Sequence, residues 1–199
     1  MAISLWAARL GRPLTERESA AMLRLLPEER RERLERIRDP EARREPLCAY
    51  LLLCLALRER CGWRSLPAIE RAPTGKPFFP EHPGIHFNLS HTRGAVLVGL
   101  GDLPLGVDIE RVRPVSPRSM RRIAGAASEQ EFFDIWVRRE ARTKCSGDGI
   151  STMMRSEEPL RCREFYHSLD TFPGYAAGVA SRDPASPEKL RRYDLDQLL

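Results

Sequence analysis

The segment that most constrains this chain is Leu105-Gly106-Val107-Asp108-Ile109-Glu110, in which apolar and acidic residues alternate. Successive side chains of a strand point to opposite faces, so this alternation predicts a strand that carries Asp108 and Glu110 on one face. Taken alone, such a pair is more often a solvated strand face than a metal site. A second segment, further along the chain, favours the metal site over the solvated strand face.

The second segment is Trp136-Val137-Arg138-Arg139-Glu140-Ala141-Arg142-Thr143-Lys144. Ser128-Glu129-Gln130-Glu131 precedes it and is typical of a helix start, and Gly147-Asp148-Gly149 follows it as a helix end. On that helix Glu140 and Lys144 lie one turn apart on the same face, where an ordinary exposed ion pair is the plain alternative.

Together the two segments favour a binding site. Three carboxylates and a lysine that converge on one place are costly unless a cation and an anion balance them. Mg²⁺ takes oxygen ligands and usually keeps substrate phosphates in its shell. We therefore expect a site for a divalent cation and a phosphate.

Composition limits the possible classes of protein. The chain has 199 residues, 42% of them hydrophobic and 31% charged, which is typical of a soluble globular protein of one domain or two small ones. Its longest apolar run, Leu47 to Leu57, is too short to span a bilayer, and the first residues do not resemble a signal peptide. The five cysteines have no paired spacing, so we expect reduced thiols in the cytoplasm.

Charge points to anionic partners. The net charge is +5 and the pI is about 9.2, which favours nucleotides, nucleic acid or an acidic protein. Nearly all the basic residues are arginine, and Lys76, Lys144 and Lys189 are the only lysines. A lysine retained in such a chain hints at a site that suits a compact ammonium group, although codon bias is an equally good explanation.

Local patterns predict the elements that carry these motifs. The first third reads as helical, with one helix from Leu25 to Arg38 and a buried one from about Leu47 to Arg60. Asp39-Pro40 resembles a helix start, and Pro46 marks a kink or the true start of the buried helix. We also expect paired strands at Ala95–Leu100 and Leu105–Glu110, a linker from Val112 to Pro117, and a strand at Gly174–Ala180.

Other motifs are individually weak. Thr74-Gly75-Lys76-Pro77 is a turn sequence without the spacing of a phosphate-binding P-loop. His91 follows Phe87-Asn88-Leu89-Ser90 and, in isolation, reads as a structural histidine. The arginine-rich stretch from Arg30 to Arg44 is usually a solvated helix face. The order and spacing of these motifs are more specific than any one of them.

That order resembles the 4'-phosphopantetheinyl transferase superfamily, in particular its longer, Sfp-type branch. The matching pieces are Gly75-Lys76-Pro77, Phe87-Asn88-Leu89-Ser90-His91, Gly106-Val107-Asp108-Ile109-Glu110, Trp136-Val137-Arg138-Arg139-Glu140-Ala141, Lys144 and Gly147-Asp148-Gly149-Ile150. The resemblance implies an α+β fold, a pseudo-dimer of two similar subdomains with the active site at their interface. The halves would be residues 1–103 and 104–199, the second of which carries the metal-binding motifs.

The resemblance also implies roles for individual residues. Asp108, Glu110 and Glu140 match the Mg²⁺ ligands, and the implied catalytic set is Glu140, Lys144 and His91. The implied coenzyme A-binding set is Arg44, Lys76, Pro77, Ser90, His91, Asp108 and Lys144, with Arg44 at the 3'-phosphate. Arg30 and Arg33 match, more loosely, basic residues that flank the nucleotide.

The implied activity is transfer of the 4'-phosphopantetheine group of coenzyme A to a serine of an apo acyl or peptidyl carrier protein, with release of 3',5'-ADP. An acidic carrier suits a basic enzyme, and we expect a monomer that binds neither nucleic acid nor membrane. Two other classes remain open. One is a degenerate relative that binds coenzyme A or a carrier without transfer, and the other is a basic nucleic-acid-binding protein, supported by pI alone.

The chain departs from the family pattern in three places. Arg139 stands where the family usually has lysine before the motif glutamate, and Ile150 stands where leucine is commoner. The stretch from Pro114 to Phe132 is shorter than usual, and we expect it to lack a helix that relatives often have there. Because that segment lies near the carrier in relatives, the choice of carrier is the property most affected.

Overall fold

A computed structural model describes residues 3–147, 161 and 163–198. The helices are α1 (Glu16–Arg24), α2 (Glu28–Glu35), α3 (Pro40–Cys61), α4 (Pro117–Ala124) and α5 (Glu129–Ser146), with a final 3-10 turn, η1 (Leu195–Gln197). The strands are β1 (Ser4–Arg9), β2 (Glu70–Arg71), β3 (Pro77–Phe78), β4 (His86–Thr92), β5 (Ala95–Gly101), β6 (Leu105–Arg111), β7 (Phe165–Ser168), β8 (Tyr175–Ser181) and β9 (Arg191–Asp194).

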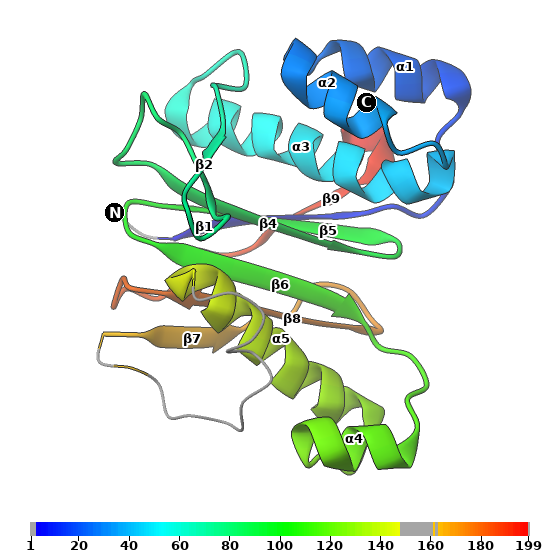
Figure 1. The fold of residues 1–199 in the computed structure, drawn as a ribbon, viewed down its shortest axis with the longest axis vertical. Coiled ribbons are helices and arrows are strands. Elements are labelled where there is room, and N and C mark those ends of the chain that lie inside the picture. The colour runs from blue at the N-terminus through cyan, green and yellow to red at the C-terminus, as the bar shows by residue number, and fades with distance from the viewer. Residues whose placement is uncertain (1–2, 148–160, 162, 199) are drawn as a thin grey trace.

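Two sheets form the middle of the molecule. The first has the strand order β4-β5-β1-β9 and the second the order β6-β8-β7, while β2 and β3 make a small separate ribbon. Figure 1 shows α1, α2 and α3 on the outer side of the first sheet, with the second sheet and α5 on its other side. This mixture of helices and largely antiparallel sheets is the α+β class that the family resemblance implies.

The pairing of β5 and β6 predicted from the sequence is wrong. β5 pairs with β4 and β1, whereas β6 pairs with β8, with Leu105 opposite Ser181 and Arg111 opposite Tyr175. The short turn that follows β5 therefore leads into a second sheet and does not close a hairpin. β9 returns to the first sheet and runs parallel to β1.

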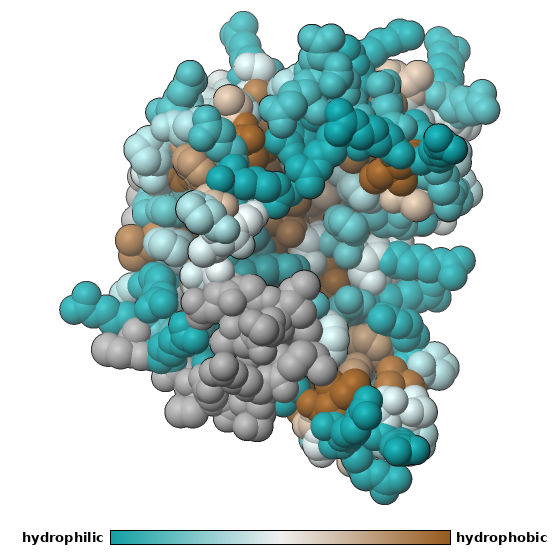
Figure 2. All heavy atoms as spheres, viewed as in Figure 1, coloured by the Kyte–Doolittle hydropathy of each residue, from teal (hydrophilic) through white to brown (hydrophobic). Residues whose placement is uncertain are grey.

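The surface is largely polar. Hydrophilic side chains cover most of the face in Figure 2, with small apolar areas between them. Among the described residues, no helix combines the length and the apolar character that crossing a membrane requires. The four cysteines within the described residues, Cys48, Cys54, Cys61 and Cys145, are free thiols.

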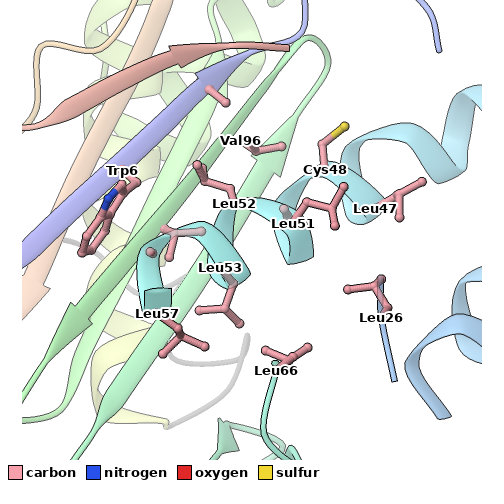
Figure 3. Close-up of a cluster of buried hydrophobic side chains, with 14 of the residues drawn as sticks. Trp6, Leu26, Leu47, Cys48, Leu51, Leu52, Leu53, Leu57, Leu66 and Val96 are labelled. Atoms are coloured by element: carbon pink, nitrogen blue, oxygen red, sulfur yellow. The ribbon is translucent and has the colours of Figure 1, made fainter. Parts of the chain in front are cut away.

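Alternating side chains of the first sheet fill two different cores. Trp6 and Val96 face α3 and pack with its leucines, as Figure 3 shows. Their neighbours Leu5 and Leu97 face the second sheet and pack against Val107. Burial on both faces explains why β1 and β5 read as almost continuous apolar runs.

The observed ends of the helices confirm some of the predicted helix starts and ends and contradict others. Asp39 caps α3 and Ser128 caps α5, as predicted, and Gly147 ends α5 in the left-handed conformation. Pro46 lies inside α3 and is not its start. Of the single helix expected from Leu25 to Arg38, only the α2 segment is helical, because α1 ends at Arg24.

Helix α4 overturns a further expectation. The stretch from Pro114 to Phe132 contains this helix, capped by Ser116 with Pro117 at its first position and Gly125 after its end. A capping serine followed by proline is a standard helix start. The linker expected from Val112 to Pro117 is confirmed as far as Ser116, because α4 begins at Pro117.

Candidate active site

Helix α5 crosses β6 at Gly106. A Cβ atom at this position would lie 2.2 Å from the carbonyl oxygen of Ala141 and 2.4 Å from the amide nitrogen of Cys145. Both contacts are with backbone, so no side-chain movement could relieve them. Glycine here lets the helix approach the strand closely, which brings Glu140 and Lys144 to the face of β6 that carries Asp108.

Asp108 is the centre of the resulting cluster. Its side chain is buried, and its Oδ1 accepts hydrogen bonds from Lys144 Nζ at 2.6 Å and Ser90 Oγ at 2.7 Å. Lys144 Nζ also lies 3.4 Å from Glu140 Oε2 and 3.1 Å from Ser90 Oγ. The structure thus brings together four predicted residues, from β4, β6 and α5.

Glu110 lies two residues further along β6 and has other partners. Its Oε2 accepts a hydrogen bond from Thr92 Oγ1 at 3.1 Å and another from Arg113 Nη1 at 2.9 Å. The guanidinium group of Arg113 also lies over the ring of Phe133, 4.7 Å from its centroid. Glu110 is therefore held by a threonine and an arginine that sequence analysis did not single out.

Lys76 and Pro77 lie at the start of β3 and behave differently. Lys76 Nζ donates to the carbonyl oxygen of Cys145 at 2.8 Å and to that of Leu105 at 3.1 Å. Burial lowers the pKa of this amine. Lys76 therefore ties the end of α5 to the start of β6.

The structure brings Arg44 and His91 together at a pocket. They border a pocket with a volume of about 350 Å³ between α3 and the β4–β5 turn, which Glu41, Glu45 and Arg93 also line. Arg44 Nη2 is 2.8 Å from Glu45 Oε1, which also accepts a hydrogen bond from the Gly94 amide at 3.1 Å. His91 follows Ser90 in β4, so it points to the opposite face of the strand from the Asp108 cluster.

Burial shifts the pKa values of two candidate catalytic groups. It raises the pKa of Glu140, an effect that the nearby Asp108 carboxylate reinforces and Lys144 opposes. It lowers the pKa of His91, and the charge of Lys144 acts in the same direction. The chemistry of both groups thus depends on their burial and on one lysine.

The donor set fits a hard divalent cation, although the carboxylates are not arranged as a ready-made chelate. Asp108 Oδ2 is buried and has no hydrogen-bond partner in the described part of the chain. An unpaired carboxylate oxygen of this kind is an available ligand. Within the described residues, no three acidic, histidine or cysteine side chains are gathered closely enough to hold a metal ion. Lys144 lies between Asp108 and Glu140, and Glu110 turns toward Thr92 and Arg113.

Two arginines that sequence analysis singled out, Arg30 and Arg139, have structural roles. Arg30 is buried and donates to Tyr50 Oη at 3.0 Å and to the carbonyl oxygen of Ile69, so it is not presented to a ligand. Arg139 donates to the carbonyl oxygen of Ile123 at 2.6 Å and so holds the end of α4 against α5. Arg33 is exposed. Ile150 lies outside the described residues.

Sequence reasoning missed Asn88 and Thr92, whose side chains reach β6 from β4. A signal for both existed. Asn88, Ser90 and Thr92 alternate with Phe87 and Leu89, which places three polar side chains on one face of a strand.

The chain is similar to curated proteins over most of its length, although no protein-family model matches it. It is 30% identical to 4'-phosphopantetheinyl transferase psf-1 of Bacillus pumilus over 158 residues, which cover 65% of this chain and 67% of that protein. It is 25% identical to 4'-phosphopantetheinyl transferase Sfp of Bacillus subtilis (strain 168), with 99% of this chain and 100% of that protein covered. Similarity to 4'-phosphopantetheinyl transferase ffp of Bacillus subtilis is 24% identity over the same shares of the two chains.

Proposed function

The chain belongs to the 4'-phosphopantetheinyl transferase family, and we propose that it transfers the 4'-phosphopantetheine group of coenzyme A to a serine of an apo acyl or peptidyl carrier protein. The observation that carries this proposal is the cluster of Asp108, Glu140 and Lys144, which combines carboxylates with a lysine in one partly buried place. Phosphoryl transfer asks a protein mainly for positioning and for compensation of charge, and this cluster can provide both.

Asp108, Glu110 and Glu140 would hold Mg²⁺, and the free Oδ2 of Asp108 supports that assignment. When bound, the cation would neutralise the pyrophosphate of coenzyme A and stabilise the charge that develops during transfer. Lys144 would supply a second positive charge beside the same phosphates.

In the proposed reaction, the carrier serine Oγ forms a bond to the phosphorus that bears pantetheine, while the bond from this phosphorus to the bridging oxygen breaks. The serine proton passes to the Glu140 carboxylate, directly or through a water molecule. The leaving 3',5'-ADP carries the bridging oxygen, and Lys144 stabilises the charge on it.

The pocket beside Arg44 and His91 would hold the nucleotide end of coenzyme A. Arg44 is the candidate for the 3'-phosphate, because its guanidinium group borders the pocket and can bind a phosphate in a fork geometry. Its existing pair with Glu45 orients the guanidinium group. Ser90, Lys76 and Pro77 remain proposed contacts with the same donor substrate.

We further propose that the two halves, residues 1–103 and 104–199, form a pseudo-dimer with the active site between them. The repeated order of elements supports this division. In each half a strand leads through shorter helical structure to a long helix, α3 or α5, and then to a pair of antiparallel strands. In each half the second strand of that pair lies beside the first strand of the half. The candidate residues come from both halves.

Helix α4 would contribute to the surface that receives the carrier. Arg118, Arg121 and Arg122 are exposed on this helix, and an acidic carrier would complement them. Figure 2 shows hydrophilic and apolar side chains next to each other over α4. The presence of this helix also removes the feature that had favoured a degenerate relative, since the segment is short and yet structured.

We propose a cytoplasmic location, which free thiols favour, and action as a monomer. The test of function is incubation with coenzyme A, Mg²⁺ and a panel of apo acyl and peptidyl carriers, followed by intact-mass measurement. We expect at least one carrier to gain one phosphopantetheine group. Coenzyme A binding without any gain of mass across the panel would instead support a binding protein.

A further inference from the structure

The outer edge of β6 is satisfied by side chains where a neighbouring strand would otherwise be. One edge of β6 pairs with β8, and the other faces β4, a strand of the first sheet. An open strand edge presents unpaired amide and carbonyl groups, which proteins usually cover. Here the cover consists of polar side chains from every second residue of β4.

Three hydrogen bonds form this cover with a constant register. The amide of Val107 donates to Asn88 Oδ1 at 2.9 Å, and that of Ile109 donates to Ser90 Oγ at 3.4 Å. The amide of Arg111 donates to Thr92 Oγ1 at 3.3 Å. The donors are every second residue of β6 and the acceptors are every second residue of β4. The three bonds therefore fix one alignment of the two strands.

The two hydroxyl groups also reach the carboxylates of β6. A hydroxyl has one hydrogen to donate and two lone pairs. Because Thr92 Oγ1 accepts from the Arg111 amide, its hydrogen can point to Glu110 Oε2 at 3.1 Å. Ser90 Oγ makes the equivalent pair of bonds with Ile109 and Asp108. Asn88, by contrast, bonds to the backbone of β6 and to neither carboxylate.

We propose that Thr92 is a positioning residue that, together with Arg113, fixes the Glu110 carboxylate, as Ser90 fixes that of Asp108. This inference rests on the proposed function, because the orientation matters only if Glu110 is a metal ligand. Glu110 has a longer and more flexible side chain than Asp108 and is less deeply buried. It therefore gains more from a fixed donor, and Thr92, anchored on a backbone amide, is such a donor.

The test measures metal binding without turnover. Mn²⁺ is titrated into the full-length protein with coenzyme A present and no carrier, and bound metal is followed by electron paramagnetic resonance. Thr92→Val keeps the shape of the side chain and removes the hydroxyl, while Thr92→Ser keeps the hydroxyl. Loss of a hydrogen-bond partner behind a metal ligand typically costs about 10- to 100-fold in affinity. We expect that loss for Thr92→Val and an affinity within roughly threefold of the parent for Thr92→Ser.

Asn88→Ala is the matched control. It removes another of the three hydrogen bonds between β4 side chains and β6 amides, and Asn88 contacts no carboxylate of β6. We expect it to lower the free energy of unfolding and to leave Mn²⁺ affinity unchanged. Equal affinity of Thr92→Val and the parent would overturn the positioning role while leaving the proposed function intact. An equal loss of Mn²⁺ affinity in Asn88→Ala and Thr92→Val would also overturn the positioning role. A general loosening of the contact between β4 and β6 would then explain both losses. A parent that binds no Mn²⁺ would overturn both proposals.

Discussion

Lys144 and Asp108 link the helix and the strand that carry the candidate site, with Nζ and Oδ1 2.6 Å apart. The pair joins α5 to β6 at the point where Ser90 of β4 also donates to Asp108. Three elements from distant parts of the chain therefore meet on one carboxylate. Their meeting depends on how closely α5 can approach β6.

Gly106→Ala tests that dependence. The added methyl group would collide with the backbone of α5, so we expect the helix to shift away from β6. Overpacking typically costs about 1–3 kcal/mol, and the shift should also separate Lys144 from Asp108. Urea unfolding and transfer rates measure the two effects. Gly84→Ala is the control, since a Cβ there meets no atom within 4 Å. Equal stability and activity of the two variants would contradict the packing argument.

Glu140→Gln tests the proposed base. The change keeps size and polarity but removes charge and basicity, so turnover should fall by at least ~10²-fold. Asp134→Asn provides a matched loss of charge on the same helix, at a residue that accepts a hydrogen bond from Gln130. We expect this control to keep the activity of the parent. Similar turnover of the two variants would assign the proton transfer to another group.

Arg44→Ala tests how the cofactor's 3'-phosphate is bound. A charge-assisted contact contributes about 1.5–3 kcal/mol, so its loss should weaken coenzyme A roughly 10- to 150-fold. Dephospho-coenzyme A lacks this phosphate and should be affected much less, so the Michaelis constants of the two substrates should converge. Arg43→Ala is the control, because this neighbouring residue bonds to Ile37 and does not line the pocket. An equal penalty on both substrates would contradict the assignment.

Cys48 predicts a pH dependence of stability. Burial within α3 raises the pKa of its thiol from 9.0 to about 12. The unfolded chain then loses this proton at lower pH than the folded one, so stability falls as pH rises above about 9, by up to ~1.4 kcal/mol per unit. Urea unfolding of the parent and of Cys48→Ala between pH 8 and about 10.5 isolates this group. Parallel stability curves would show that the thiol is not shielded as described.

Local patterns predicted the elements that carry the site. Alternation in β6 and the four-residue spacing on α5 placed Asp108, Glu140 and Lys144 on facing surfaces, and the structure brings them together. Helix ends followed capping chemistry at Asp39 and Ser128. These features are local, because a cap or a periodicity depends on a few neighbouring residues.

Features that depend on distant partners were not predictable in this way. A short turn between two apolar runs looks the same whether the second run closes a hairpin or enters another sheet, so the pairing of β6 with β8 was missed. The bonds of Lys76 to Leu105 and Cys145 join segments far apart in sequence, and no local pattern indicates them. Helix α4 is a different case, because its start at Ser116-Pro117 is a local capping signal that sequence analysis did not use.

The most direct test of the central claim is the amount of 3',5'-ADP released for each carrier serine modified, measured for the parent and for Asp108→Asn. The substitution keeps the shape of a buried side chain but removes a charged candidate ligand of the cation. We predict one 3',5'-ADP for each modified serine with the parent, and no detectable product with a folded Asp108→Asn variant. A fully active Asp108→Asn variant, or a parent that modifies no carrier, would contradict the account.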